Sequence, residues 1–289
     1  MSSLMKPAWL NKKIGLQACA EMKQFLRGLK VETVCEQAMC PNIGECFSRK
    51  EATFLILGRF CTRNCGFCNI EKGLPLAPDL DEPRRVAEGV SRLSLKHVVV
   101  TSVTRDDLVD GGASIFADTV SRIRRVSAQI KIEILIPDFK LSQEALAIVA
   151  GSRADIIAHN VETVPSLYKS VRQGADYNKS LGVLKKIKEL SPDVKTKSGI
   201  MLGLGEKEEE VISVMDDLRM ARCDFLSIGQ YLAPSKRHYP VKEYIEPQKF
   251  DYYKKKGEGL GFSHIESAPY VRSSYMAADY FKKGDVSIF

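Results

Sequence analysis

The chain has 289 residues, of which 44% are hydrophobic and 27% charged, and 43 Lys and Arg against 36 Asp and Glu give a formal net charge of +7. This composition is typical of a folded globular protein and excludes a disordered chain. The longest uninterrupted apolar run, at residues 145–150, is far shorter than the roughly 20 residues of a membrane-spanning helix. The first residues also lack the apolar core of a signal peptide. We therefore expect a cytoplasmic protein that binds no membrane.

Strand-like and helix-like patterns alternate along most of the chain. An amphipathic helix is expected at 16–29, and a short apolar strand at 53–57 follows it. Further strands are expected at 96–101, 131–136, 155–159, 196–201 and 224–229, with helices near 82–94, 112–127, 141–150, 178–190, 206–221 and 246–257. Strands that alternate with crossover helices form parallel βα units. Six units are too few for a complete eight-fold barrel, so we predict an α/β fold with a partial (βα)6 TIM-like barrel or an open sheet.

Eight cysteines are present, and six of them fall between residues 35 and 68. Thiols stay reduced in the cytosol, so a cluster of cysteines there indicates metal or redox chemistry rather than disulfides. Cys19 and Cys223 stand apart from this cluster, and we interpret each as a small buried apolar residue.

Cys61, Cys65 and Cys68 have the spacing C-x3-C-x2-C and follow the expected strand at 53–57. Three thiolates on one loop can each bind one iron of a cubane iron–sulfur cluster, which leaves the fourth iron without a ligand from this loop. An open metal position can bind a substrate or cofactor, and barrel-type folds place their chemistry at the carboxyl ends of strands. A zinc site would require a fourth ligand and a ferredoxin would supply a fourth cysteine; neither pattern is present.

Cys35, Cys40 and Cys46 form a second triplet with the spacing C-x4-C-x5-C. The different spacing predicts a second cluster rather than a shared one. The alternative is a zinc site on the amino-terminal extension that takes its fourth ligand from elsewhere in the chain.

The first triplet, with Phe67 before its last cysteine, resembles the signature of the radical S-adenosylmethionine (SAM) superfamily. The two triplets together resemble the lipoyl synthase family. Further segments similar to that family occur in the expected order at 6–10, 101–107, 110–113, 159–164, 171–177, 197–206, 229–235 and 272–275. The last of these segments is Arg272-Ser-Ser-Tyr275.

The resemblance implies a radical SAM-type barrel at 53–258. An extension at 1–52 would carry the auxiliary cluster cysteines, and one at 259–289 would carry the Arg272-Ser-Ser-Tyr275 motif. The resemblance also implies two [4Fe-4S] clusters: a SAM-binding cluster on Cys61, Cys65 and Cys68, and an auxiliary cluster on Cys35, Cys40, Cys46 and Ser274. Serine is a harder ligand for a cluster iron than thiolate, so its weaker bond would let that iron leave.

The function implied by the resemblance is that of a sulfurtransferase. A radical derived from SAM would remove hydrogen from C6 and then C8 of a protein-bound octanoyl-lysine, and the auxiliary cluster would donate both sulfur atoms. These carbons are unactivated, so acid–base catalysis would not suffice and a cofactor must supply the radical. The implied substrates are octanoylated lipoyl domains or the glycine-cleavage carrier protein, and an electron donor of unknown identity is also required. The alternatives are another dual-cluster radical SAM sulfurtransferase and a metal-binding scaffold that does no chemistry.

Asn160, Glu162 and Arg172 are the candidates for contacts with SAM. The first two follow the expected strand at 155–159 and are suited to the ribose or amino group, and Arg172 is suited to the carboxylate. For each of them the alternative is a structural hydrogen bond within a loop. The four histidines, His97, His159, His238 and His264, are scattered, and we interpret all of them as structural or surface residues.

Basic residues occur in small groups on the expected helices, where solvated helix faces are the ordinary interpretation. Nucleic-acid binding would predict aromatic residues among these charges, and few are present, so we expect no nucleic-acid partner. If the carrier protein is acidic, the positive net charge assists docking, and we expect Lys185, Lys186 and Lys188 to contribute.

Overall fold

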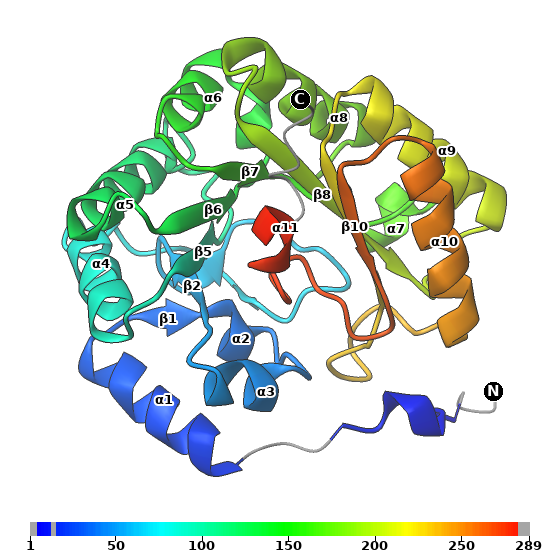
Figure 1. Cartoon of the computed structure of the whole chain (residues 1–289), viewed down its shortest axis with the longest axis horizontal. Coiled ribbons are helices and arrows are strands. Elements are labelled where there is room, and N and C mark those ends of the chain that lie inside the picture. The colour runs from blue at the N-terminus through cyan, green and yellow to red at the C-terminus, as the bar shows by residue number, and fades with distance from the viewer. Residues whose placement is uncertain (1–4, 13–15, 283–289) are drawn as a thin grey trace.

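The computed structural model describes residues 5–12 and 16–282 of the chain. Its main sheet has eight strands in the order β1-β2-β5-β6-β7-β8-β9-β10 and curves into a barrel that does not close (Figure 1). The six expected strands are β2 (Thr53–Ile56), β5 (His97–Ser102), β6 (Lys131–Leu135), β7 (Ile156–Ala158), β8 (Lys195–Leu202) and β9 (Phe225–Gln230). All six are parallel. The prediction of a partial α/β barrel is confirmed.

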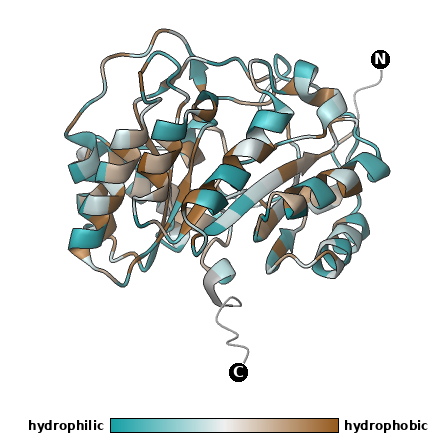
Figure 2. Cartoon of the chain, turned by 90° about the horizontal axis from the view of Figure 1, so that it is seen from above, coloured by the Kyte–Doolittle hydropathy of each residue, from teal (hydrophilic) through white to brown (hydrophobic). Residues whose placement is uncertain are grey.

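Helices form a ring around the outside of this sheet (Figure 1). They are α4 (Glu82–Arg92), α5 (Ala113–Val126), α6 (Gln143–Ala150), α8 (Tyr177–Leu190), α9 (Glu208–Met220) and α10 (Pro247–Gly259). Apolar residues gather on the strands and on the helix surfaces that face them, whereas the outward surfaces are mostly polar (Figure 2). Val90, Phe116 and Ile132, for example, have no exposed surface. Burial of this apolar layer stabilises the barrel and leaves its interior for polar residues.

The two edges of the sheet come from outside the six-strand core. β1 (Glu32–Thr33) pairs with β2 in antiparallel fashion, and β10 (His264–Ser267) adds to β9 in parallel. Neither strand was predicted, because runs of two and four residues show too little periodicity. Before β2 lie η1 (Ala8–Leu10), α1 (Leu16–Gly28), α2 (Val34–Gln37) and α3 (Ile43–Ser48), and α11 (Asp279–Lys282) follows β10. α2 and α3 lie at the side where the sheet stays open (Figure 1).

A buried ion pair fills the barrel in the amino-terminal halves of the strands. Lys197 Nζ lies 3.0 Å from Glu133 Oε1, and neither side chain is exposed. The Tyr280 ring of α11 covers the lysine, with 3.9 Å from Nζ to the ring centroid, and packs edge-on against Phe225. α11 therefore closes this end of the barrel and leaves the opposite end for a site. Among the described residues, no helix is long and apolar enough to cross a membrane.

Candidate metal and cofactor centre

The loop with Cys61, Cys65 and Cys68 lies beyond the carboxyl end of β2. It folds back on itself through the short strands β3 (Phe60–Cys61) and β4 (Glu71–Lys72), which pair with each other. The Thr62 N–H donates to the Thr104 carbonyl at 3.1 Å, just after β5, and the Gly66 N–H donates to the Val171 carbonyl at 2.9 Å. The loop is therefore attached to two separate parts of the barrel mouth.

Arg63, within this loop, makes the strongest attachment. Its Nε lies 2.7 Å from Asp106 Oδ2 and its Nη1 lies 2.6 Å from Asp138 Oδ2, and the Arg63 side chain is 10% exposed. Burial alone would raise the pKa of Asp138, but the hydrogen bonds and charge of Arg63 lower it to about 2. Because paired donors fix geometry as well as charge, Arg63 locks the loop onto the ends of β5 and β6. Cysteine spacing alone does not identify Arg63 as a residue of the site. Its position between the candidate ligands Cys61 and Cys65 is the sequence feature that could have indicated it.

The three thiols of this loop lie close enough to influence one another. Burial raises the pKa of Cys68 to about 12 and also raises the pKa of Cys65, and the charge of Cys61 acts in the same direction on both. Such thiols are protonated at neutral pH and release their protons when they bind a metal. In the described ranges, no three His, Cys, Asp or Glu side chains form a group that holds a single metal ion. Thiolates of a cubane each bind a different iron, so this donor set fits an iron–sulfur cluster.

The second triplet lies on α2 and α3, with Cys40 in the turn between them. Burial raises the pKa of Cys35 to about 12 and that of Cys46 to about 11, and the nearby Cys40 contributes to both shifts. The guanidinium of Arg272 is partly buried and also interacts with Cys40. The structure therefore brings these three cysteines together and puts a partly buried cation beside them.

Ser274 lies at the same place, although it is far away in the sequence. The Thr53 hydroxyl donates to Ser274 Oγ at 2.7 Å, across a separation of 221 residues. Thr53 also lies beside the Cys35 thiol and opposes the rise in the pKa of that thiol. Thr53 thus connects the serine of the carboxyl-terminal motif to the amino-terminal cysteines. An oxygen donor beside three thiols fits the fourth ligand position of a cluster.

Hydrogen bonds hold the two chain extensions together around this second triplet. Lys12 Nζ lies 2.6 Å from Glu45 Oε2, and the Tyr275 hydroxyl donates to Glu45 Oε1 at 2.9 Å. The Asn42 side chain accepts from Lys12 at 2.7 Å and donates to the Tyr270 carbonyl at 2.8 Å. The sequence pattern does not reveal this group, because its members have no periodic relation to each other.

The two triplets adjoin one another. The Asn69 side chain, next to Cys68, donates to the Gln37 carbonyl of α2 at 2.8 Å. On the other side of the site, Asn160 Nδ2 donates to Ser273 Oγ at 2.6 Å. Ser273 directly precedes Ser274, so one short turn contacts residues of both candidate sites.

Asn160 and Glu162, two of the three candidate SAM contacts, interact directly. Asn160 Nδ2 donates to Glu162 Oε1 at 3.0 Å, and Asn160 Oδ1 is buried without a hydrogen-bond partner in the described part of the chain. Glu162 has a positive φ of 68° and is held by a parallel bridge to Ile200 of β8. Burial raises the pKa of Glu162, and Arg172 opposes that shift. A buried acceptor and a partly buried carboxylate are suited to bind a cationic or hydroxyl-bearing ligand.

Arg172, the third candidate, is buried next to the same group. Its Nη1 donates to the Tyr168 hydroxyl and to Ser180 Oγ, each at 2.9 Å. Its charge also acts on Glu162 and on Cys65. The structural hydrogen bonds weighed as the alternative are therefore present, and the residue still lies beside the first triplet.

Other sequence-based interpretations have mixed outcomes. Cys19 and Cys223 are buried, as expected. His159 Nδ1 lies 2.9 Å from the Ile136 carbonyl, which fits a structural role, and burial lowers its pKa to about 4.

The inclusion of Lys188 in a surface patch was wrong. Lys188 is 7% exposed, and its Nζ lies 2.7 Å from both the Val194 carbonyl and Asp224 Oδ2. These two partners directly precede β8 and β9, so Lys188 lies on the side of α8 that faces the amino-terminal ends of these strands.

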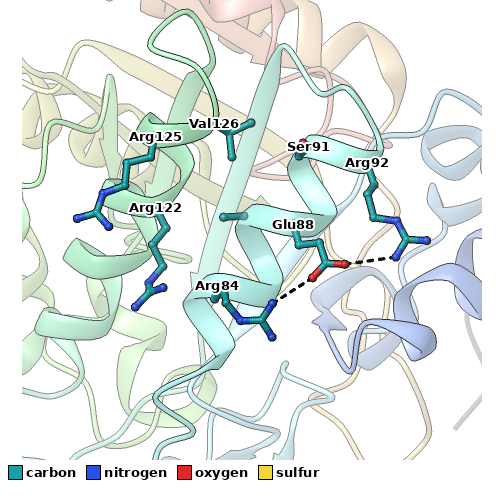
Figure 3. A pocket seen from close by; sticks show the side chains of 8 residues that line it. Arg84, Glu88, Ser91, Arg92, Arg122, Arg125 and Val126 are labelled. Atoms are coloured by element: carbon teal, nitrogen blue, oxygen red, sulfur yellow. Dashed lines mark hydrogen bonds and ion pairs between the residues drawn. The ribbon is translucent and has the colours of Figure 1, made fainter.

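A groove of about 400 Å³ lies between α4 and α5 on the outside of the barrel (Figure 3). Four arginines line it, Arg84 and Arg92 from α4 and Arg122 and Arg125 from α5, with one acid among them, Glu88. Glu88 bridges Arg84 and Arg92, as the dashed lines in Figure 3 mark. We call this surface the arginine groove. The arginine groove is basic overall. The helix α4 begins beside the end of β2, where the Leu57 N–H donates to the carboxylate of Glu82.

The sequence matches the Radical SAM superfamily over residues 55–218. It is 57% identical over 282 residues to a lipoyl synthase of Geobacter sp. (strain M21), a match that covers 98% of this chain and 97% of the relative. It is 58% identical over 275 residues to a lipoyl synthase of Geobacter sulfurreducens, covering 95% of this chain and 90% of the relative.

Solved structures of low sequence identity share the fold. The FeFe-hydrogenase maturase HydG from Carboxydothermus hydrogenoformans has a TM-score of 0.55 at 15% identity and covers 93% of this chain and 80% of its own. Methylornithine synthase has a TM-score of 0.55 at 14% identity, over 74% of this chain and 70% of its own. These likenesses support the radical SAM architecture.

Proposed function

The chain belongs to the lipoyl synthase family of the radical SAM superfamily and is a sulfurtransferase, and from this premise we propose that it inserts sulfur at C6 and C8 of a protein-bound octanoyl-lysine. Family membership implies a [4Fe-4S] cluster and SAM, and we propose a second, auxiliary [4Fe-4S] cluster as the source of both sulfur atoms. When bound, these groups supply hydrogen abstraction at unactivated carbon and the sulfur that replaces the hydrogen.

We assign the two clusters to separate ligand sets. Cys61, Cys65 and Cys68 would hold the SAM-binding cluster, and this assignment is supported by their single loop, their mutual interactions and the lock made by Arg63. The set for the auxiliary cluster consists of Cys35, Cys40, Cys46 and Ser274. The contact between Thr53 and Ser274, beside Cys35, is the observation that supports it most strongly.

Asn160, Glu162 and Arg172 would orient SAM beside the first set. Asn160 offers a buried acceptor without a partner in the described residues, and Glu162 offers a carboxylate for the ribose hydroxyls or the amino group. Arg172 contributes a positive charge next to Cys65, suited to the carboxylate of SAM. Asn160 and Arg172 are buried and Glu162 is partly buried, so these side chains help to exclude water from the place where the radical chemistry needs a dry site.

The substrate would reach this site on a carrier, either an octanoylated lipoyl domain or the glycine-cleavage carrier protein. We propose that an acidic carrier surface docks on the arginine groove, since Arg125 has no acidic partner among the described residues and the groove begins near the end of β2. An electron donor of unknown identity completes the set of partners. We assign the reaction to the cytoplasm, where the thiols stay reduced for cluster assembly.

An isotope experiment tests the proposal. The protein would be reconstituted without oxygen with iron and heavy-isotope sulfide, freed of excess sulfide, and incubated with SAM, a reductant and an octanoylated lipoyl domain in buffer that contains ordinary sulfide. We expect a lipoyl product in which both sulfur atoms carry the heavy label. Ordinary sulfur in the product would refute the auxiliary cluster as donor. SAM cleavage without sulfur insertion would favour a different dual-cluster sulfurtransferase, and absence of both reactions would favour a metal-binding scaffold.

A further inference from the structure

We propose that Thr53 is a positioning residue that holds Ser274 at the auxiliary cluster site. The inference rests on the proposed role of Ser274 as an iron ligand, and it adds a residue that neither cysteine spacing nor the carboxyl-terminal motif identifies. The observation that supports the inference most directly is the 2.7 Å hydrogen bond from the Thr53 hydroxyl to Ser274 Oγ.

Thr53 is rigidly placed. It is the first residue of β2, is 5% exposed and lies in register with Val99 of β5. The next residue, Phe54, is paired with β1 on the other side. A hydroxyl on a strand that is paired with both neighbours moves little, so it is a fixed point against which a mobile side chain can be held.

Ser274, in contrast, lies on a turn whose other contacts leave its own side chain unrestrained. Tyr275 is held by Glu45, and Ser273 is held by Asn160. For the Ser274 hydroxyl itself, Thr53 is the one hydrogen-bond partner found among the described residues. A free serine side chain has three rotamers, so removal of this contact would leave Oγ without a fixed direction while the turn stays in place.

Thr53 also lies beside the other half of the ligand set, next to the Cys35 thiol, whose pKa it helps to lower. One residue of the barrel core therefore sets the relative position of a thiol from the amino-terminal extension and a hydroxyl from the carboxyl-terminal one. Residues that hydrogen-bond metal ligands orient them, and their loss typically weakens metal binding about 10- to 100-fold.

The arrangement also suits a ligand that must leave its iron. As an iron ligand Ser274 Oγ would be an alkoxide, and it would take up a proton from water when it leaves; in both forms it keeps a lone pair that can accept from Thr53. The released oxygen therefore keeps a hydrogen-bond partner, which lowers the cost of opening the cluster.

The test isolates the auxiliary site in a protein that carries Cys61→Ala, Cys65→Ala and Cys68→Ala. After anaerobic reconstitution, the rate of iron release to a ferrous-iron chelator is measured, together with the EPR spectrum of the reduced cluster. Thr53→Val, which keeps the β-branched shape but removes the hydroxyl, should release the first iron about tenfold faster than its parent. Thr53→Ser should release it at the parental rate, because the hydroxyl is retained.

A matched control removes another buried hydroxyl hydrogen bond. Thr119→Val removes a bond from a buried threonine to the Ile115 carbonyl within α5. This variant should keep the parental release rate and EPR spectrum. Faster release in Thr119→Val, equal to that in Thr53→Val, would overturn the inference, because it would show a general effect of buried-hydroxyl loss.

Ser274→Ala separates the inference from the proposed function. If Ser274→Ala releases iron fast and Thr53→Val does not, Thr53 has no positioning role, although Ser274 remains the ligand. If Ser274→Ala behaves like its parent, the ligand assignment itself is wrong. In the Ser274→Ala background, Thr53→Val should add nothing, and an additive effect would also contradict the inference. Thr53→Ala, judged by the same criteria, replaces Thr53→Val if that variant fails to fold.

Discussion

The two cysteine triplets occupy sites that are built in opposite ways. Cys61, Cys65 and Cys68 lie on one loop that Arg63 fastens to the ends of two barrel strands. The auxiliary set is assembled from both extensions of the chain, which meet at Thr53 and through the Glu45–Tyr275 contact. The first site is thus part of the barrel, whereas the second depends on contacts between distant segments. We expect the second site to lose and regain its cluster without disruption of the barrel.

The largest expected effect separates the two sites by function. Cys35→Ala, Cys40→Ala and Cys46→Ala together should abolish lipoyl product but leave SAM cleavage intact, because Arg63 fastens the loop of the first site to the barrel strands. Cys61→Ala, Cys65→Ala and Cys68→Ala should abolish both. Mass spectrometry of the carrier and chromatography of the SAM products measure the two activities. Loss of SAM cleavage in the first variant would contradict the separation.

Arg63→Gln should damage the first site and spare the second. It leaves Asp138 buried without its ion-pair partner, which typically costs about 3–5 kcal/mol of unfolding free energy. Urea unfolding measures that loss, and SAM cleavage should fall with it while auxiliary iron is retained. Arg59→Gln is the control, since the exposed Arg59–Glu71 pair contributes at most about 1 kcal/mol. Equal effects of the two variants would show that Arg63 does not lock the loop.

Lys12→Met should have a smaller effect, confined to the second site. It removes the hydrogen bond that does most to lower the pKa of Glu45 to about 2, and we expect a loss of about 1 kcal/mol in unfolding free energy. A lowered carboxyl pKa contributes stability that is fully present above the unfolded value of about 4.5 and is lost as the pH falls toward 2. The difference between parent and variant should therefore be constant from pH 8 to pH 5. A decline within that range would contradict the assignment.

The last prediction concerns docking of the carrier, away from both cluster sites. Arg122→Glu with Arg125→Glu should weaken binding of an acidic octanoylated lipoyl domain by roughly tenfold at low salt, with a smaller loss at high salt. The matched variant, Lys185→Glu with Lys186→Glu, makes the same change in net charge on α8. Isothermal titration compares the two. Equal weakening would assign the effect to overall charge and remove the arginine groove as the docking surface.

The barrel core was largely predictable from the sequence. All six expected strands lie within one residue of their observed ends, because strands buried on both faces form continuous apolar runs such as residues 98–100. The first cysteine set was predictable for a similar reason, since its members are neighbours on one loop. Residue spacing is sufficient to predict a strand or a ligand set when its members are close together in the sequence.

Features that depend on tertiary contacts were not predictable from spacing. Ser274 could be identified as a candidate ligand only from the family resemblance, because 221 residues separate it from its partner Thr53. Lys197 and Glu133 lie in different strands, 64 residues apart in the sequence, and nothing local marks the two as partners. Lys188 has the sequence context of a surface lysine, but an acid and a carbonyl from the next strands draw it into the protein.

Anaerobic determination of iron and sulfide is the most direct test of two separate cluster sites. It would compare the parent protein with the variant that lacks Cys61, Cys65 and Cys68 and with the variant that lacks Cys35, Cys40 and Cys46. We predict about eight irons per chain in the parent and about four in each variant. About four irons in the parent, or loss of all iron in either variant, would contradict two independent clusters.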